Sequence, residues 1–179
     1  MINDNQFKWN KDLIQQCINK NQFEKLNKKD KEGYPGFIWA CKNQPKLALI
    51  MLERNNVDFN TQNNFGNTGF ITACINQSQL AKIMLEQDNI NFNIQNKVGN
   101  TGFIVVCSEQ PELIIPMLKN KKINTSLKNS DGKTGWDIAK EYNPESFKIY
   151  QEFLIKQQHQ KLKSNITSEN KTKKTKSLL

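Results

Sequence analysis

The stretch NTGFITAC at residues 67–74 recurs 33 positions later as NTGFIVVC at residues 100–107. Variants of it stand one period further out on either side, as YPGFIWAC at 34–41 and KTGWDIAK at 133–140. Two glycine series keep the same spacing, namely Gly33, Gly66, Gly99 and Gly132, and Gly36, Gly69, Gly102 and Gly135. A period held at so many positions predicts a solenoid, in which each unit is stabilised by its neighbours.

Each 33-residue unit has the pattern of a helix, a turn, a second helix and a finger. Helix N-caps are predicted at the threonine before each apolar run, at Thr68, Thr101 and Thr134. The first position of a second helix tolerates the missing N–H of proline, as at Pro45, Pro111 and Pro144. The stretch NNVDFNTQNNFGN at residues 55–67 then predicts an extended finger closed by a tight turn.

These residues resemble the ankyrin repeat, whose pattern is a turn followed by T-P-L-H-x-A-A, a second helix and a finger. The resemblance covers residues 33 to about 155 as four units and implies an all-α ankyrin-repeat solenoid. In this chain T-G replaces T-P, and Ile or Asp replaces the His, so the usual Thr–His hydrogen bond is absent. Apolar packing must replace it, and a buried aromatic spine is expected at Phe37, Phe70, Phe103 and Trp136.

Three segments are predicted along the chain. Residues 1–32 form a shortened N-terminal capping unit, and residues 33–163 form four repeats that end in a long capping helix from Pro144 to about Lys161. Residues 164–179 form a Lys-rich tail, which we expect to be disordered because it is too polar to repay its ordering entropy. Pro116 falls inside a second helix, where we expect a kink or an irregular turn.

Composition and charge narrow the class of protein. With 179 residues, 36% of them hydrophobic, the chain can bury a core, but it has no apolar run of the roughly 20 residues that a membrane span needs. The N-terminus has no basic stretch followed by an apolar one, so we expect a cytoplasmic protein, with the nucleus as the alternative. The net charge is +9, and residues 156–179 hold seven lysines against one glutamate.

The residues that could carry catalysis or bind metal are better explained structurally. Cys41, Cys74 and Cys107 recur at the repeat period, but equivalent positions on packed helices lie ~8–10 Å apart, too far for a disulfide or a zinc site. We expect them, and Cys17, to be buried in the core. The only histidine, His159, stands in a polar stretch and is expected at the surface. Neither an enzyme nor a cofactor or metal is expected.

The resemblance implies that the chain binds a protein, of unknown identity, through a concave surface of finger tips and first helices. We expect a monomer, and neither a small-molecule substrate nor a membrane as a partner. The implied contact residues are Tyr34, Asn64, Phe65, Asn67, Ile75, Asn76, Lys97, Val98, Asn100, Ser108 and Glu109.

Phe65 is predicted to be the anchor of that surface. Phe65 and Val98 are apolar at the finger position where the two outer units carry Glu32 and Asp131, an arrangement typical of an interface with a dry centre and a charged rim. The alternative that Phe65 and Val98 merely pack on adjacent fingers stays open.

A second function is a nuclear or nucleic-acid-associated regulator that binds through the Lys-rich tail. The tail contains no interleaved aromatic residues for base stacking, which argues against nucleic acid as the partner. Salt separates the two functions, because binding to phosphates weakens steeply as salt concentration rises.

Overall fold

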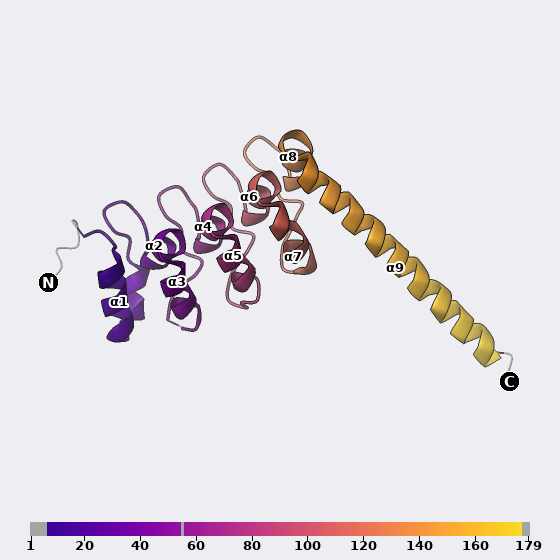
Figure 1. The fold of residues 1–179 in the computed structure, drawn as a ribbon, viewed down its shortest axis with the longest axis horizontal. Coiled ribbons are helices and arrows are strands. Elements are labelled where there is room, and N and C mark those ends of the chain that lie inside the picture. Colours follow the sequence, from indigo (N-terminus) through magenta and orange to yellow (C-terminus); the bar gives the residue numbers. More distant parts are fainter. Residues whose placement is uncertain (1–6, 55, 177–179) are drawn as a thin grey trace.

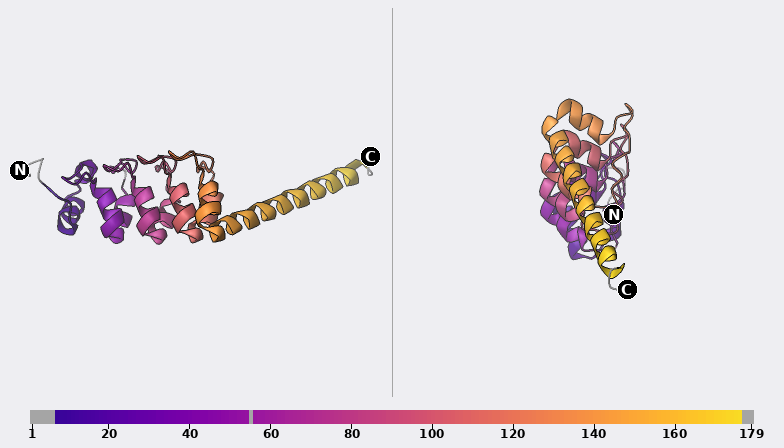
Figure 2. Two further views of the ribbon diagram at one scale, coloured as in Figure 1. Left: turned by 90° about the horizontal axis from the view of Figure 1, so that it is seen from above. Right: turned by 90° about the vertical axis from the view of Figure 1, so that its right-hand side faces the viewer.

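The computed structural model describes residues 7–54 and 56–176, which form a row of stacked helix pairs. The elements are α1 (Lys11–Asn19), η1 (Phe23–Asn27), α2 (Gly36–Asn43), α3 (Pro45–Leu52), α4 (Gly69–Asn76), α5 (Ser78–Met84), α6 (Gly102–Glu109), η2 (Pro111–Leu113), α7 (Ile114–Lys119), α8 (Gly135–Tyr142) and α9 (Pro144–Lys176). The first helices α2, α4, α6 and α8 follow one another along the row, and the loops between units project from one side of it (Figures 1 and 2). Within these residues the only β-pairing is two isolated bridges, so the expected all-α solenoid is confirmed.

The predicted threonine caps are present at the start of the first helices. The Thr68 side chain accepts from the Ile71 N–H, Thr101 accepts from Ile104, and Thr134 accepts from Asp137. In the last of these the Asp137 carboxylate also accepts from the Thr134 N–H, which completes a capping box. Each cap satisfies a backbone donor that the helix cannot satisfy itself, and so fixes where the helix begins.

The two glycine series have different structural roles. Gly66 and its equivalents turn the finger tip with φ between +73° and +80°, a left-handed conformation that costs glycine little. Gly69 instead allows a close approach, because a Cβ there would lie 2.4 Å from a ring carbon of Phe37 in the preceding unit. The same relation holds between Gly102 and Phe70, at 2.6 Å. One glycine therefore shapes the finger, and the other lets successive first helices stack.

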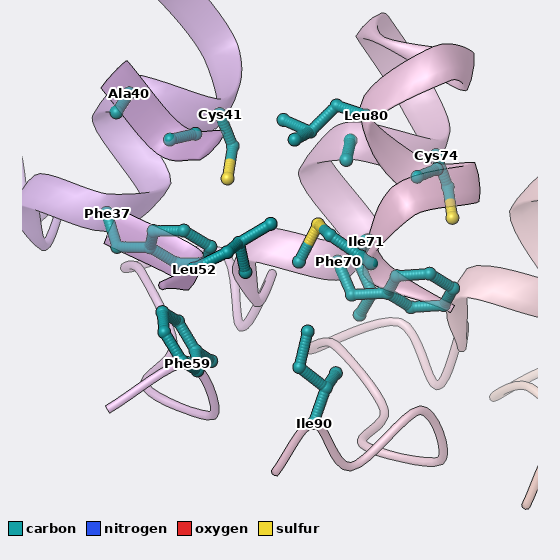
Figure 3. Close-up of a cluster of buried hydrophobic side chains, with 14 of the residues drawn as sticks. Phe37, Ala40, Cys41, Leu52, Phe59, Phe70, Ile71, Cys74, Leu80 and Ile90 are labelled. Atoms are coloured by element: carbon teal, nitrogen blue, oxygen red, sulfur yellow. The ribbon is translucent and has the colours of Figure 1, made fainter. Parts of the chain in front are cut away.

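The core is the expected aromatic spine, repeated from unit to unit. Phe37, Phe70 and Phe103 are each 1% exposed. Phe37 meets Phe59 edge to face, with ring centroids 4.7 Å apart, and Phe70 meets Phe92 in the same way at 4.8 Å. Figure 3 shows two successive copies of this cluster, with Phe37 beside Phe59 and Phe70 above Ile90.

Trp136 differs from the other members of the spine because it closes the stack. It is only half-buried, with Phe103 on one side (centroid distance 4.8 Å) and Tyr150 of α9 stacked on the other at 3.4 Å. The element after α8 is α9, and its Tyr150 ring covers the face of Trp136 that the first helix of a next unit would occupy in a regular repeat. α9 therefore acts as the C-terminal cap of the solenoid.

All four cysteines are buried free thiols, as expected. Burial raises the pKa of the Cys41, Cys74 and Cys107 thiols far above its ordinary value, which keeps them protonated and unreactive in the folded chain. Cys41 and Cys74 occupy equivalent places in successive units (Figure 3). Their recurrence follows from packing, because the repeat demands a small apolar side chain at this position.

The irregular turn expected at Pro116 is present. The second helix of that unit is divided into a 3₁₀ turn, η2, and a short α-helix, α7. Proline has no N–H to donate to the Glu112 carbonyl, and its ring crowds that carbonyl, so a regular helix cannot continue across Glu112.

The C-terminal helix is longer than predicted. We expected order to end near residue 163, but α9 continues as one helix of 33 residues to Lys176. No glycine or proline follows Pro144, and the Lys, Gln and Glu residues there have good helix propensity. Figures 1 and 2 show the distal part of α9 projecting away from the repeats. Residues 177–179 of the predicted tail lie outside the described residues.

Replacing Phe70 with Ala should lower the free energy of unfolding by ~3–5 kcal/mol, the usual loss for a buried aromatic side chain. Phe70 supports its own unit and also lies against Gly102 of the next one. The matched control is His159→Ala, which removes an exposed side chain and should change stability little. Similar losses for both variants in urea denaturation would contradict the assignment of the spine.

Ending the chain at residue 163 should leave the melting temperature unchanged, because the removed part of α9 projects beyond the repeats. The total helical ellipticity should fall, since residues 164–176 are helical in the structure. Circular dichroism measures both quantities on the same samples. A truncated chain with a clearly lower melting temperature would show that the distal part of α9 supports the stack.

Candidate functional site

One side chain in each unit organises the finger tip. In the second finger, Asn63 Oδ1 accepts hydrogen bonds from the Phe65 N–H (2.9 Å) and the Asn67 N–H (3.0 Å). The same pair of bonds, to the residues two and four positions later, is made at Asp30, Asn96 and Asn129. Each tip is therefore closed by its own Asx turn, combined with the left-handed glycine.

This series of acceptors is present in the sequence but was not predicted from it. Asp30, Asn63, Asn96 and Asn129 are spaced by 33 residues, each three positions before a turn glycine. Asp and Asn share a side-chain oxygen at the same place, so the series becomes visible only when the two residue types are treated as one acceptor.

The fingers are also bonded to one another. The Lys97 N–H donates to the Phe65 carbonyl (3.1 Å), and the Ser130 N–H donates to the Val98 carbonyl (3.1 Å). Between the second and third fingers, Asn96 Nδ2 donates to Asn67 Oδ1 at 2.9 Å. These bonds tie the tips of the second, third and fourth fingers into one row, so that a partner would meet a surface whose backbone is already ordered.

The tips of the two central fingers expose large apolar groups, as expected. Phe65 is 62% exposed and Val98 is 58% exposed, while their backbone groups are hydrogen-bonded. A side chain that packed on the adjacent finger would be largely covered, so this exposure argues against the packing alternative. Isolated exposed apolar residues are common, but two neighbours held on a fixed backbone form a surface that can be buried by a partner.

The first-helix positions contribute unequally. Asn76 and Glu109 are exposed at the ends of α4 and α6, as the resemblance implies. Ile75 is half-buried and packs against the core, so the expectation that it adds to the exposed patch is corrected. Ser108 is also half-buried, and its hydroxyl donates to the Val105 carbonyl at 2.8 Å. Ile75 and Ser108 are therefore only partly accessible to a partner, because they lie where the first helices still face the core.

The remaining predicted contact residues belong to the fingers. Asn64 and Lys97 are exposed, whereas Tyr34, Asn67 and Asn100 are half-buried at the base of the tips. Asn64 and Lys97 adjoin Phe65 and Val98 in sequence. The backbone N–H groups of Tyr34, Asn67 and Asn100 donate to the side-chain oxygens that close the turns.

The N-terminal end of the row carries a small polar pocket of about 190 Å³. It is lined by Lys8, Glu32, Tyr34, Trp39, Lys42 and Asn43. Lys8 Nζ lies 2.7 Å from the Glu32 carboxylate, which raises the pKa of Lys8, and Lys42 Nζ lies 5.4 Å from the centroid of the Tyr34 ring. Tyr34 thus lies in this pocket together with Trp39, a residue that was not among the predicted contact residues.

The C-terminal end of the row is charged in the same manner. Lys133 forms an ion pair with Glu141, and the hydrogen bond from Lys133 holds the pKa of the Glu141 carboxyl below its usual range. Lys133 Nζ also lies 5.3 Å from the centroid of the Tyr142 ring. Ion pairs therefore flank the row at both ends, and the exposed apolar side chains occupy its centre.

Within the described residues, no cluster of three or more His, Cys, Asp or Glu could hold a metal ion. The same part of the chain contains no helix that is both long and apolar enough to cross a membrane.

Comparison with known proteins bears on the fold. No model of a protein family matches the sequence, and no curated protein matches it. A solved structure does match: the crystal structure of EF0377, an ankyrin repeat protein, aligns with a TM-score of 0.64 over 77% of this chain and 78% of that one. The chain has the ankyrin-repeat fold.

The two chains are 20% identical, so the likeness extends to the arrangement of helices and fingers and to nothing more specific. The ankyrin fold accounts for the spacing of both glycine series and for the row of tips on one side of the helices.

Replacing Asn63 with Ala should destabilise the chain by about 1–3 kcal/mol, because two backbone N–H groups lose their acceptor at once. Asn63→Asp is the matched control, since Asp30 performs the same task in the first finger. Urea denaturation measures the stability, and hydrogen exchange at the Phe65 and Asn67 amides reports on the turn itself. Equal behaviour of the two variants would show that the side-chain acceptor does not hold the tip.

Proposed function

We propose that this protein is a non-enzymatic interaction module that binds a partner protein through its row of finger tips and the exposed ends of its first helices. The observation that carries the proposal is the exposure of Phe65 and Val98 on adjacent, hydrogen-bonded fingers. The contact surface also includes the neighbouring Asn64 and Lys97 and the exposed helix ends at Asn76 and Glu109.

The energetic case rests on Phe65. A phenylalanine side chain that is 62% exposed presents a large apolar area, and burying such an area is worth roughly 25 cal/mol per Å². Aromatic side chains near the centre of an interface commonly dominate binding. The tip of this finger is already fixed by Asn63 and by the Lys97 N–H, so little further backbone entropy is lost when a partner binds.

The arrangement fits a protein partner better than a small molecule. Small-molecule sites are usually enclosed cavities of about 300–1,000 Å³, whereas the pocket on this face measures about 190 Å³ and lies at one end of the row. An apolar centre between charged ends is the usual design of a protein interface. The ion pairs of Lys8 with Glu32 and of Lys133 with Glu141 supply those ends.

A second candidate function, binding of nucleic acid by the Lys-rich arm, is favoured by the length of α9. Residues 156–179 contain seven lysines, and all seven lie in α9, which continues to Lys176. Binding of this kind should weaken steeply between about 50 and 200 mM salt, whereas an interface centred on Phe65 should change little.

The Phe65→Asp variant should lose capture of the partner protein from an extract of the source cell, because a carboxylate would replace the apolar anchor. The matched control is Ile155→Asp, which changes an apolar residue of α9 that is 52% exposed. The captured proteins are compared by mass spectrometry between the unchanged chain and each variant. Both variants should keep the melting temperature, since neither side chain is part of the core.

Two outcomes would contradict the proposal. A Phe65→Asp chain that unfolds would assign Phe65 to packing between fingers, and one that folds and captures the same partner would move the site elsewhere. A chain ending at residue 163 separates the second candidate function, because loss of capture only in that variant would assign binding to the distal part of α9.

A further inference from the structure

A second hollow surface lies among the second helices and shares no residue with the finger tips. A cavity of about 690 Å³ between α5 and α7 is lined in part by Leu85, Ile115, Pro116, Lys119 and Lys121. A cavity of about 640 Å³ between α7 and α9 is lined in part by Ile115, Leu118, Lys119, Ile149, Phe153 and Lys156. Both include Ile115, Lys119 and Lys121, so the two cavities form one surface across α7, here called the α7 groove.

The groove exists because the second helix of this unit is irregular. Pro116 divides that helix into η2 and α7, and α5 packs against η2. On its other side α7 packs against α9. The turn that proline imposes therefore leaves side chains of α7 without the close neighbours that a regular stack would give them.

The floor of the groove is apolar and partly open. Ile115, Leu118, Ile149 and Phe153 are each half-buried, and Leu118 and Ile149 extend the core outward to the surface. A ligand that covers this floor must supply apolar side chains of its own, because polar groups of the ligand would be buried there without hydrogen-bond partners.

The rim of the groove carries a net positive charge, and the part that α7 contributes is basic where the preceding unit is acidic. Lys119 and Lys121 stand where the preceding unit has Glu86 and Asp88. Glu86, Asp88 and Glu152 also line the groove, and Asp88 is paired with Lys122. Five lysines face these three carboxylates, so the lining keeps a net positive charge. In the part of the chain that the structure describes, no ion pair involves Lys119, Lys121 or Lys156. The charge reversal coincides with the proline that opens the groove.

We propose that the α7 groove is a second docking surface, which takes an acidic amphipathic helix from a partner protein. The apolar face of that helix would cover Ile115, Ile149 and Phe153, and its flanking carboxylates would face Lys119, Lys121 and Lys156. A groove between helices with an apolar floor is a usual receptor for an amphipathic helix. The lysines of the rim would attract a helix with acidic flanks and repel a helix with basic flanks.

The chain itself offers no suitable occupant in its C-terminal arm. Residues 156–179 hold seven lysines and one glutamate, so the arm of a second copy would be repelled by the rim. Nucleic acid matches the charge but not the apolar floor, and it is therefore one outcome of the test.

The test uses the full chain and two displayed libraries of helical peptides. Both libraries randomise the same apolar positions among Leu, Ile, Phe and Met, and the flanking positions are Glu in one library and Lys in the other. Only the Glu library should yield binders. Fluorescence anisotropy of a labelled binder then measures its dissociation constant for each protein variant.

Lys119→Glu combined with Lys121→Glu should weaken that binder by about tenfold or more, because the rim then repels the peptide. The preceding unit already carries acidic residues at both equivalent positions, so the fold accommodates them. The matched control, Lys20→Glu with Lys46→Glu, makes the same change of charge at exposed residues outside the groove and should leave affinity within about twofold.

Phe65→Asp should also leave the affinity for this peptide unchanged, which separates the groove from the finger tips. The proposal is overturned if the Glu library yields no binder, if the Lys library yields equal ones, or if the Lys119 and Lys121 changes have no effect. Displacement of the peptide by polyglutamate or by single-stranded DNA at equal concentration would also overturn it, because the surface would then recognise charge alone.

Discussion

The structure depends on one close contact, repeated along the solenoid, between a phenylalanine ring and the glycine that opens the next first helix. At Gly69 a Cβ would meet the Phe37 ring at 2.4 Å, so no other residue lets the two helices approach this far. The ring in turn fills the space that the close approach encloses, and Phe37 is 1% exposed. The glycine and the phenylalanine therefore form one packing contact between successive units, in which the absence of a Cβ makes room for the ring.

This contact explains how the chain keeps the ankyrin fold with an unusual consensus. The Thr–His hydrogen bond of the family is absent, but Thr68 still caps the helix through the Ile71 N–H. Ile71, at the place of the family's His, is 1% exposed and contributes apolar packing instead. In this chain, aromatic packing between units replaces a hydrogen bond within one unit. Contacts between units are the ones by which each repeat of a solenoid stabilises its neighbours.

Much of the fold could be predicted from the sequence, because each local sequence pattern occurs in several units at the same spacing. The threonine caps, the spine and the turn at Pro116 all follow from short-range patterns that hold in the structure. The length of α9 could not be predicted from burial, since backbone hydrogen bonds and helix propensity continue it past the last packed residue. The half-buried state of Ile75 and the α7 groove depend on neighbours from other elements, which no local pattern describes.

In a solenoid the core positions must repeat, because each unit packs against a copy of itself. Surface positions are free of that requirement, so folding does not fix which residues stand there. Two departures from the period are clustered, namely the apolar tips of the central fingers and the basic, proline-interrupted second helix that carries Lys119. They share no residues, and a change at Phe65 leaves the lining of the α7 groove untouched. The two proposed docking surfaces therefore use different residues of the stack, so a substitution can remove one of them without changing the other.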